Sequence, residues 1–179
     1  MSKVQTDNSF FYEKCKLRLD NLPDNDINVL DLFHGDGKIW KYLKKNHKYC
    51  VNVVGIDIKD KEDVYLKGDN LKYIEKIDID NFDIIDVDAY GVPFKQLDLL
   101  FKKSKKEKIY FVTCIQSMFG GIPHGLLEDL GYTKQMIKKI PSMFNKNGLS
   151  KFKSWLALKG ISNIKSYEFN NKLYCYFKK

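Results

Sequence analysis

Short apolar runs alternate with helix-like stretches along most of the chain. The runs at 28–33, 51–58, 82–88 and 109–115 predict buried strands, and a shorter strand is expected just before residue 68. The segments between these runs carry helical patterns, as in the stretch KIWKYLKKN at 38–46. Strand and helix therefore alternate five times, which predicts an α/β fold with a mostly parallel, Rossmann-like sheet and helices on both faces.

The end of the chain breaks this alternation. An amphipathic helix is expected at 149–159, followed by two strand-like runs, NIKSYEF and KLYCYFKK, on either side of Asn170-Asn171. Because asparagine tolerates a positive φ angle, this pair predicts a tight hairpin. The expected sheet therefore has seven strands and ends in an antiparallel hairpin, an arrangement unlike the usual nicotinamide-binding fold and similar to the class I methyltransferase architecture.

Two segments lie outside this regular pattern. Residues 1–27 form an N-terminal extension in which a helix is expected at 8–20, with Asn8 or Ser9 as its cap. Residues 116–148 are longer than a simple crossover requires, and such excursions at strand ends often build substrate sites. We expect one domain over residues 1–179, with 116–148 as an insertion on the substrate side.

Charge and composition limit the range of functions. The formal net charge is +8, which gives mild support for an anionic partner such as a nucleic acid, although Arg18 is the only arginine. The four cysteines and three histidines have no zinc-site spacing, so no metal is expected. With neither a signal-peptide pattern nor an apolar run of about 18–20 residues, the sequence predicts a cytoplasmic protein that does not enter the membrane.

The stretch 29-VLDLFHGDG-37 predicts a ligand site between a buried strand and a helix. Gly35 and Gly37 would let a ligand approach backbone N–H groups closely. Asp57, which ends the next strand 20 residues after Gly37, can accept both hydroxyls of a ribose. Asp69 follows the third strand, where it could contact an adenine amino group. The pattern thus predicts an adenosine-containing cofactor.

The choice of cofactor depends on charge. A dinucleotide site usually has a full G-x-G-x-x-G, but Lys38-Ile39-Trp40 follow Gly37, and Asp36 would repel a pyrophosphate. S-adenosylmethionine carries no phosphate, and its sulfonium and ammonium groups suit a carboxylate such as Asp31 at the end of the first strand. The residues therefore favour S-adenosylmethionine over NAD.

On these residues, VLDLFHGDG resembles motif I of the class I S-adenosylmethionine-dependent methyltransferases, over roughly residues 28–178. The resemblance is specific for the cofactor and much less so for the substrate. It implies a wider set of cofactor contacts along the ends of the first four strands. These are Asp31, Phe33, Gly35, Gly37, Asp57, Ile58, Asp69, Asn70 and Asp86.

The fourth strand and its loop, 85-IDVDAYGVP-93, resemble the D-x-D-P-F-G-x-P pattern of the tRNA guanine-26 N2-methyltransferase family. An exocyclic amine is a poor nucleophile because its lone pair is delocalised, and a carboxylate that accepts its hydrogens localises that pair. The resemblance implies Asp88 as the catalytic carboxylate with Asp86 beside it, and Tyr90 as the stacking platform for the base. Ala89 replaces the family's proline, and the chain lacks the family's C-terminal domain.

We therefore expect methyl transfer to an amino nitrogen, most favourably of a nucleobase in RNA rather than DNA, with a tRNA-like guanine N2 as the leading case. Alternatives remain open: a DNA, protein or small-molecule methyltransferase, or a methyltransferase-like binding protein without catalysis. Cys114 in VTC offers a further alternative, a thiol nucleophile as in RNA cytosine-5 methyltransferases. His34 either shapes the turn or contacts a ligand. The sequence does not fix the oligomeric state.

Overall fold

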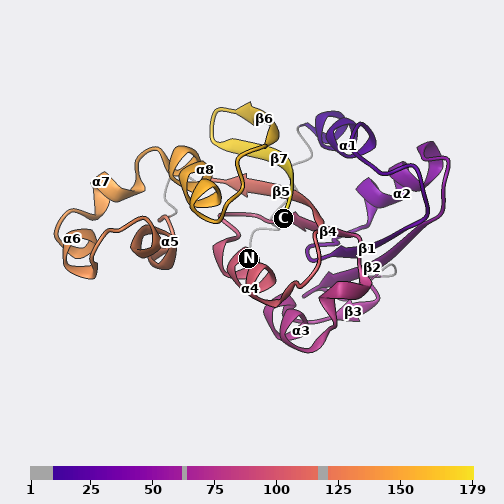
Figure 1. Ribbon diagram of the computed structural model, residues 1–179, viewed down its shortest axis with the longest axis horizontal. Helices are drawn as coiled ribbons and strands as arrows, with labels where there is room; N and C mark the ends of the chain where they lie inside the picture. Colours follow the sequence, from indigo (N-terminus) through magenta and orange to yellow (C-terminus); the bar gives the residue numbers. More distant parts are fainter. Residues whose placement is uncertain (1–9, 62–63, 117–120) are drawn as a thin grey trace.

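The computed structural model describes residues 10–61, 64–116 and 121–179, and its centre is one sheet flanked by helices (Figure 1). The strands are β1 (Ile27–Asp31), β2 (Val51–Asp57), β3 (Leu66–Lys67), β4 (Ile84–Asp88), β5 (Ile109–Ile115), β6 (Lys165–Phe169) and β7 (Lys172–Lys178). The helices are α1 (Phe11–Leu19), α2 (Lys38–Asn46), α3 (Asn70–Lys76), the 3-10 turn η1 (Ile79–Asn81), α4 (Phe94–Lys103), α5 (His124–Asp129), α6 (Lys134–Lys139), α7 (Pro141–Asn145) and α8 (Gly148–Leu158).

The strand order across the described sheet is β3-β2-β1-β4-β5-β7-β6. Strands β1 to β5 are parallel, and β7 pairs antiparallel with both β5 and β6. The predicted seven-stranded, mostly parallel sheet with a C-terminal hairpin is thereby confirmed. Asn170 adopts a φ of 43° in the hairpin turn, as expected from its tolerance of the left-handed region.

Two apolar clusters hold the helices to opposite faces of the sheet. On one face, Trp40 and Leu43 of α2 pack with Cys15 of α1 against the sheet. The larger cluster on the other face includes Leu97 of α4 and Trp155 of α8, and both side chains are fully buried. This layering follows from the alternating chain, because each crossover helix must bury its apolar face on the sheet.

The predicted N-terminal helix is confirmed as α1, although its expected cap at Asn8 or Ser9 lies outside the described residues. The helix buries Cys15, and it also buries Arg18, although a charged residue normally lies on the solvent side. α1 packs beside α2 and β7. Two of its charged residues, Lys14 and Arg18, contact the carboxylates at the carboxyl end of β4.

The predicted insertion, of which 117–120 lie outside the described residues, forms the short helices α5, α6 and α7. We call the described residues 121–147 the arm, and Figure 1 shows its helices projecting beyond the sheet. Gln116 ties the arm to the sheet, since its side chain donates to the Asn145 carbonyl and accepts from the Gly148 amide at 2.8 Å. Among the described helices, none is both long and apolar enough to cross a lipid bilayer.

Candidate functional site

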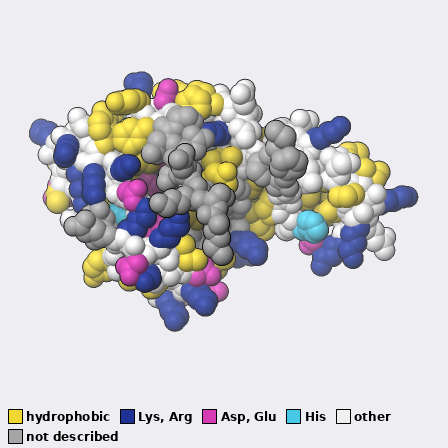
Figure 2. All heavy atoms as spheres, turned by 180° about the vertical axis from the view of Figure 1, so that it is seen from behind, with side chains coloured by type: hydrophobic (Ala, Val, Ile, Leu, Met, Phe, Trp, Pro, Cys, Tyr) yellow, Lys and Arg dark blue, Asp and Glu magenta, His cyan; other side chains and the backbone are white. Residues whose placement is uncertain are grey.

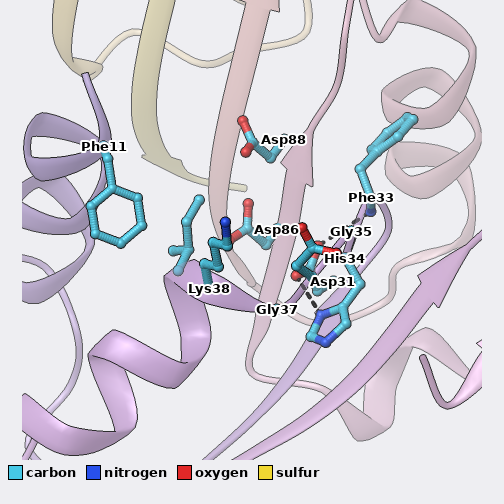
Figure 3. Close-up of a pocket in the computed structure, with 11 residues that line it drawn as sticks. Phe11, Asp31, Phe33, His34, Gly35, Gly37, Lys38, Asp86 and Asp88 are labelled. Carbon is cyan, nitrogen blue, oxygen red and sulfur yellow. Dashed lines mark hydrogen bonds and ion pairs between the residues drawn. The ribbon is translucent and has the colours of Figure 1, made fainter. Parts of the chain in front are cut away.

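A cavity of about 100 Å³ opens where β1 and β4 end, beside the start of α2 (Figure 3). It is smaller than the roughly 300–1,000 Å³ of typical ligand pockets, so it would enclose only part of a cofactor. The described residues that line it are Phe11, Asp31, Phe33, His34, Gly35, Asp36, Gly37, Lys38, Ile39, Asp86 and Asp88. The fold therefore brings motif I and the fourth-strand carboxylates to one site.

The glycine turn has a left-handed backbone at both of its glycines. Gly35 and Gly37 have φ angles of 57° and 64°. The imidazole of His34 fills the space beneath the turn: a Cβ at Gly37 would lie 2.7 Å from it, and a Cβ at Gly55 of β2 only 2.4 Å. Of the two predicted roles for His34, the observed packing supports the one that shapes the turn.

Asp31 is a buried carboxylate at the end of β1. It accepts hydrogen bonds from the Phe33 amide at 3.2 Å and is bonded to Nδ1 of His34 at 2.9 Å. Burial raises the pKa of Asp31 to about 6, and nearby Asp86 adds to the effect while His34 opposes it. A cationic ligand in the cavity would favour the ionised form, so this residue suits the sulfonium or ammonium of the predicted cofactor.

Asp57 and Ile58 lie at the end of β2, beside the glycine turn. One carboxylate oxygen of Asp57 accepts from the Gly35 amide at 2.8 Å, and the other accepts from the Lys59 amide at the same distance. Each oxygen keeps a second lone pair for a ribose hydroxyl. Ile58 is 74% exposed, which leaves its side chain available to an adenine ring.

Asp69 and Asn70 make contacts that the sequence did not indicate. Asp69 caps α3 by accepting from the Leu71 amide at 2.9 Å. Asn70 donates to the Leu32 carbonyl at 3.0 Å and accepts from Gln96 at 3.2 Å, so it ties α3 to β1 and α4. Both residues lie outside the cavity lining, and their predicted contact with the cofactor stays a prediction.

Every hydrogen bond observed at the Asp86 carboxylate comes from a protein side chain. Arg18 donates to its two oxygens at 2.7 and 2.8 Å, and Trp40 Nε1 donates to it at 2.9 Å. The side chains of Arg18 and Asp86 are 2% and 1% exposed. Asp86 therefore fastens α1 to β4, a structural function that its predicted catalytic and cofactor-binding roles did not include.

Asp88, on the same face of β4, is bonded to Lys14 of α1. The Lys14 ammonium donates to both carboxylate oxygens, at 2.7 and 2.9 Å. Burial acts to raise the pKa of Asp88, but Lys14 and Arg18 outweigh it and hold that pKa below its usual value. The predicted catalytic carboxylate is thus ionised and already binds a positively charged nitrogen.

The loop after β4 exposes its aromatic residue. Tyr90 is 74% exposed, whereas Ala89 is buried and Gly91 takes a φ of 128°. An exposed ring beside Asp88 can stack on a base. Cys114, by contrast, lies in the apolar core and burial raises its pKa, so the structure does not support the alternative of a thiol nucleophile.

Lys14 and Arg18 are the site residues that sequence analysis missed. Both stand on α1, four residues apart, opposite the two carboxylates of β4. One signal was available: the chain's only arginine sits on the helix face that carries Cys15. Among the described residues, no cluster of three potential metal ligands is found.

No protein-family model and no curated protein matches the chain. Solved structures do match: Trm1 from Pyrococcus horikoshii with S-adenosyl-L-methionine has a TM-score of 0.61 and 15% identity over 99% of this chain and 58% of that one. A putative rRNA-methylase from Clostridium thermocellum has a TM-score of 0.52 and 16% identity, over 98% of this chain and 100% of that one. The precorrin-6y C5,15-methyltransferase from Geobacter metallireducens has a TM-score of 0.53 and 12% identity, over 100% of this chain and 91% of that one.

These likenesses show the fold, which is that of class I S-adenosylmethionine-dependent methyltransferases. The chain spans less than two thirds of the length of several similar structures, Trm1 among them. The matched proteins carry names with different methyl acceptors, so the acceptor must be argued from the site itself.

Proposed function

We propose that this protein is an S-adenosylmethionine-dependent methyltransferase that acts on an amino nitrogen of a nucleobase in RNA. The observation that carries the proposal is the contact between Asp88 and Lys14, in which a carboxylate at the cavity binds a cationic nitrogen through both oxygens. Methyl transfer to an amine creates such a nitrogen, so a site that stabilises it lowers the barrier.

The cofactor half of the site is formed by motif I. The bound cofactor would supply an electrophilic methyl group on a positively charged sulfur. Asp31 would face that charge from the cavity wall. The space beside Gly35 is open, since a Cβ built there would meet only the Phe33 carbonyl, 4.0 Å away. The ligand can therefore approach the turn closely at Gly35. Asp57 and Ile58 would hold the adenosine outside the enclosed cavity.

The acceptor half is formed by the end of β4. Asp88 would accept hydrogen bonds from the acceptor amine and localise its lone pair on nitrogen. Transfer of the methyl group from the cofactor sulfur, which would become a neutral thioether, would give the acceptor nitrogen a positive charge beside Asp88. Asp88 would then take the proton that the nitrogen loses and pass it to water.

Two features of the surface suit a nucleic acid. Tyr90, two residues after Asp88 in the chain, offers a flat exposed ring for a base to stack on. Every charged residue from 134 to 153 is a lysine, and Figure 2 shows lysine and apolar side chains gathered at the outer end of the arm. The exposed apolar residues there are Met136, Ile140 and Met143. An acceptor RNA that lies along the arm would bring its phosphates to these lysines, with which they can pair.

Guanine N2 is the specific acceptor that we favour, because the order Asp86-x-Asp88-x-Tyr90-Gly91 follows the tRNA guanine-26 N2-methyltransferase pattern. RNA is favoured over DNA on the same resemblance. A small-molecule or protein acceptor, and a binding protein without catalysis, are the other outcomes that an experiment must separate.

The test uses methyl-labelled S-adenosylmethionine with separate pools of RNA, DNA, protein and metabolites. We expect label in RNA, and we expect Asp88→Asn to abolish it while cofactor binding, followed by calorimetry, persists. Asp20→Asn, which alters an exposed carboxylate at the end of α1, is the matched control and should label RNA normally. Label only in other pools, or cofactor binding without label, would contradict the proposal.

A further inference from the structure

The two cations of α1 are held to β4 in different ways. The pair formed by Arg18 and Asp86 is almost fully buried, and Trp40 adds a third hydrogen bond to it. The pair formed by Lys14 and Asp88 lies at the cavity edge, where the side chains are 12% and 20% exposed. The second pair is therefore the more accessible of the two.

An acceptor amine and Lys14 would bind the same carboxylate. The ammonium occupies both oxygens of Asp88, which are the atoms that would accept the hydrogens of the amine. The Lys14 backbone cannot retreat easily, because α1 is fastened through Arg18, whose guanidinium also bonds the Lys14 carbonyl at 3.0 Å. An acceptor amine that displaces one of these hydrogen bonds therefore leaves the ammonium beside it.

Once displaced, this cation needs a new hydrogen-bond acceptor. It lies 5.1 Å from the centre of the Tyr174 ring, a contact that can hold part of its charge but accepts no strong hydrogen bond. A charge in a largely enclosed site is costly when it is unpaired. An acceptor atom next to the amine of the bound substrate would supply this hydrogen bond.

We propose that Lys14 determines substrate specificity by donating to a ring nitrogen or carbonyl oxygen that flanks the acceptor amine. This inference rests on the proposed function and narrows its substrate class to neutral amines on heteroaromatic rings. A nucleobase amine is uncharged and flanked by such atoms. Alkyl amines, as in protein lysines or polyamines, are cations without a neighbouring acceptor, and Lys14 would repel them.

The experiment pairs one variant with one substrate change. An RNA oligonucleotide carrying the acceptor base is compared with analogues in which each ring nitrogen flanking the amine is replaced by CH. Wild type and Lys14→Met, which keeps the side-chain stem, are measured for Kd by fluorescence anisotropy and for kcat/KM. Lys16→Met, on the exposed face of the same helix, is the matched control, and unchanged melting temperatures confirm folding.

We expect one analogue to bind wild type about tenfold or more weakly, in the range of a hydrogen bond to a charged group. Lys14→Met should lose a similar factor on the natural base and nothing further on that analogue, whereas Lys14→Arg should keep part of the discrimination. Lys16→Met should behave as wild type.

Independent, multiplying losses would overturn the inference, because Lys14 and the ring atom would then not be partners. A rise in kcat/KM for Lys14→Met would overturn it too, because Lys14 would then only block Asp88. These results leave the proposed function standing. Absence of methyl transfer to any RNA base by wild type would instead overturn the proposed function, and the inference with it.

Discussion

Arg18 of α1 places its guanidinium against both carboxylate oxygens of Asp86 on β4, and one helical turn earlier Lys14 does the same with Asp88. The spacings match: four residues along a helix rise about 6 Å, and two residues along a strand rise about 6.6 Å. The N-terminal helix is therefore fastened to the strand that carries the predicted catalytic residues, and it forms part of the site.

Breaking the buried pair formed by Arg18 and Asp86 should strongly lower the stability of the protein. Arg18→Met should lower the free energy of unfolding by about 3–5 kcal/mol, because Asp86 is left as an uncompensated buried charge. Denaturant unfolding measures this loss. Lys16→Met, whose ion pair with Asp20 is exposed, should change stability by less than about 0.5 kcal/mol.

The double variant Arg18→Met/Asp86→Leu removes both charges and should recover much of the lost stability. If it is no more stable than Arg18→Met alone, the loss came from packing of the arginine stem and the electrostatic account is wrong.

The packing of His34 predicts that a small substitution in β2 will disturb the motif I turn. Gly55→Ala adds a Cβ that would lie 2.4 Å from the imidazole, so His34 must move and its bond to Asp31 must break. We expect a stability loss of about 1–3 kcal/mol, as for overpacked cores, together with weaker cofactor binding by calorimetry.

The double variant His34→Ala/Gly55→Ala checks this account, because the smaller side chain frees the space that the new methyl group needs. Its unfolding free energy should exceed the value that the two single variants predict by addition. Strict additivity would show that the imidazole and residue 55 do not compete for space.

Asp31 predicts a pH dependence of cofactor binding. Its pKa of about 6 means that the free protein holds a proton there below that pH, and a bound cation must displace it. The affinity for S-adenosylmethionine should therefore fall as pH is lowered from 7 to 5, by at most about tenfold per unit.

Asp31→Asn should bind S-adenosylmethionine more weakly at pH 7 and with a flatter pH profile, as measured by calorimetry between pH 5 and 7. An Asp31→Asn profile as steep as that of wild type would assign the proton to another group.

Replacing Tyr90 should change the affinity for the acceptor RNA and leave the affinity for the cofactor unchanged. Tyr90→Ala should weaken RNA binding by about 1–3 kcal/mol, the value of one base–aromatic stack, with no change in cofactor affinity. Tyr90→Phe keeps the ring and should resemble wild type. Tyr12→Ala removes an aromatic residue of equal exposure, 73%, and serves as the control for nonspecific ring contacts. Equal losses in the two alanine variants would contradict a specific stack.

The sequence predicted what depends on local pattern and missed what depends on tertiary pairing. Alternating runs were enough for the sheet, and Gly35 and Gly37 were recognisable because their positive φ angles are a backbone requirement. The partners of Asp86 and Asp88 lie about 70 residues earlier in the chain. Apart from the position of Arg18 on the helix face that carries Cys15, the pattern of α1 marked neither Lys14 nor Arg18, since a charged residue normally indicates the solvent side.

Asp69 shows the converse problem. Its position after the third strand fits an adenine contact, but an aspartate before a helix also fits an N-cap, and the structure shows the cap. An aspartate between a strand and a helix is thus typical both of an adenine contact and of an N-cap, and the sequence alone does not separate them.

The central claim, methyl transfer to an amino nitrogen of an RNA base, is tested most directly by identifying the modified nucleoside. RNA incubated with the protein and methyl-labelled S-adenosylmethionine would be digested to nucleosides and analysed by mass spectrometry. We predict a nucleoside with the methyl group on its exocyclic amine, absent with Asp88→Asn. A methyl group on a ribose oxygen or a ring carbon, or label found only in protein or metabolites, would contradict the account.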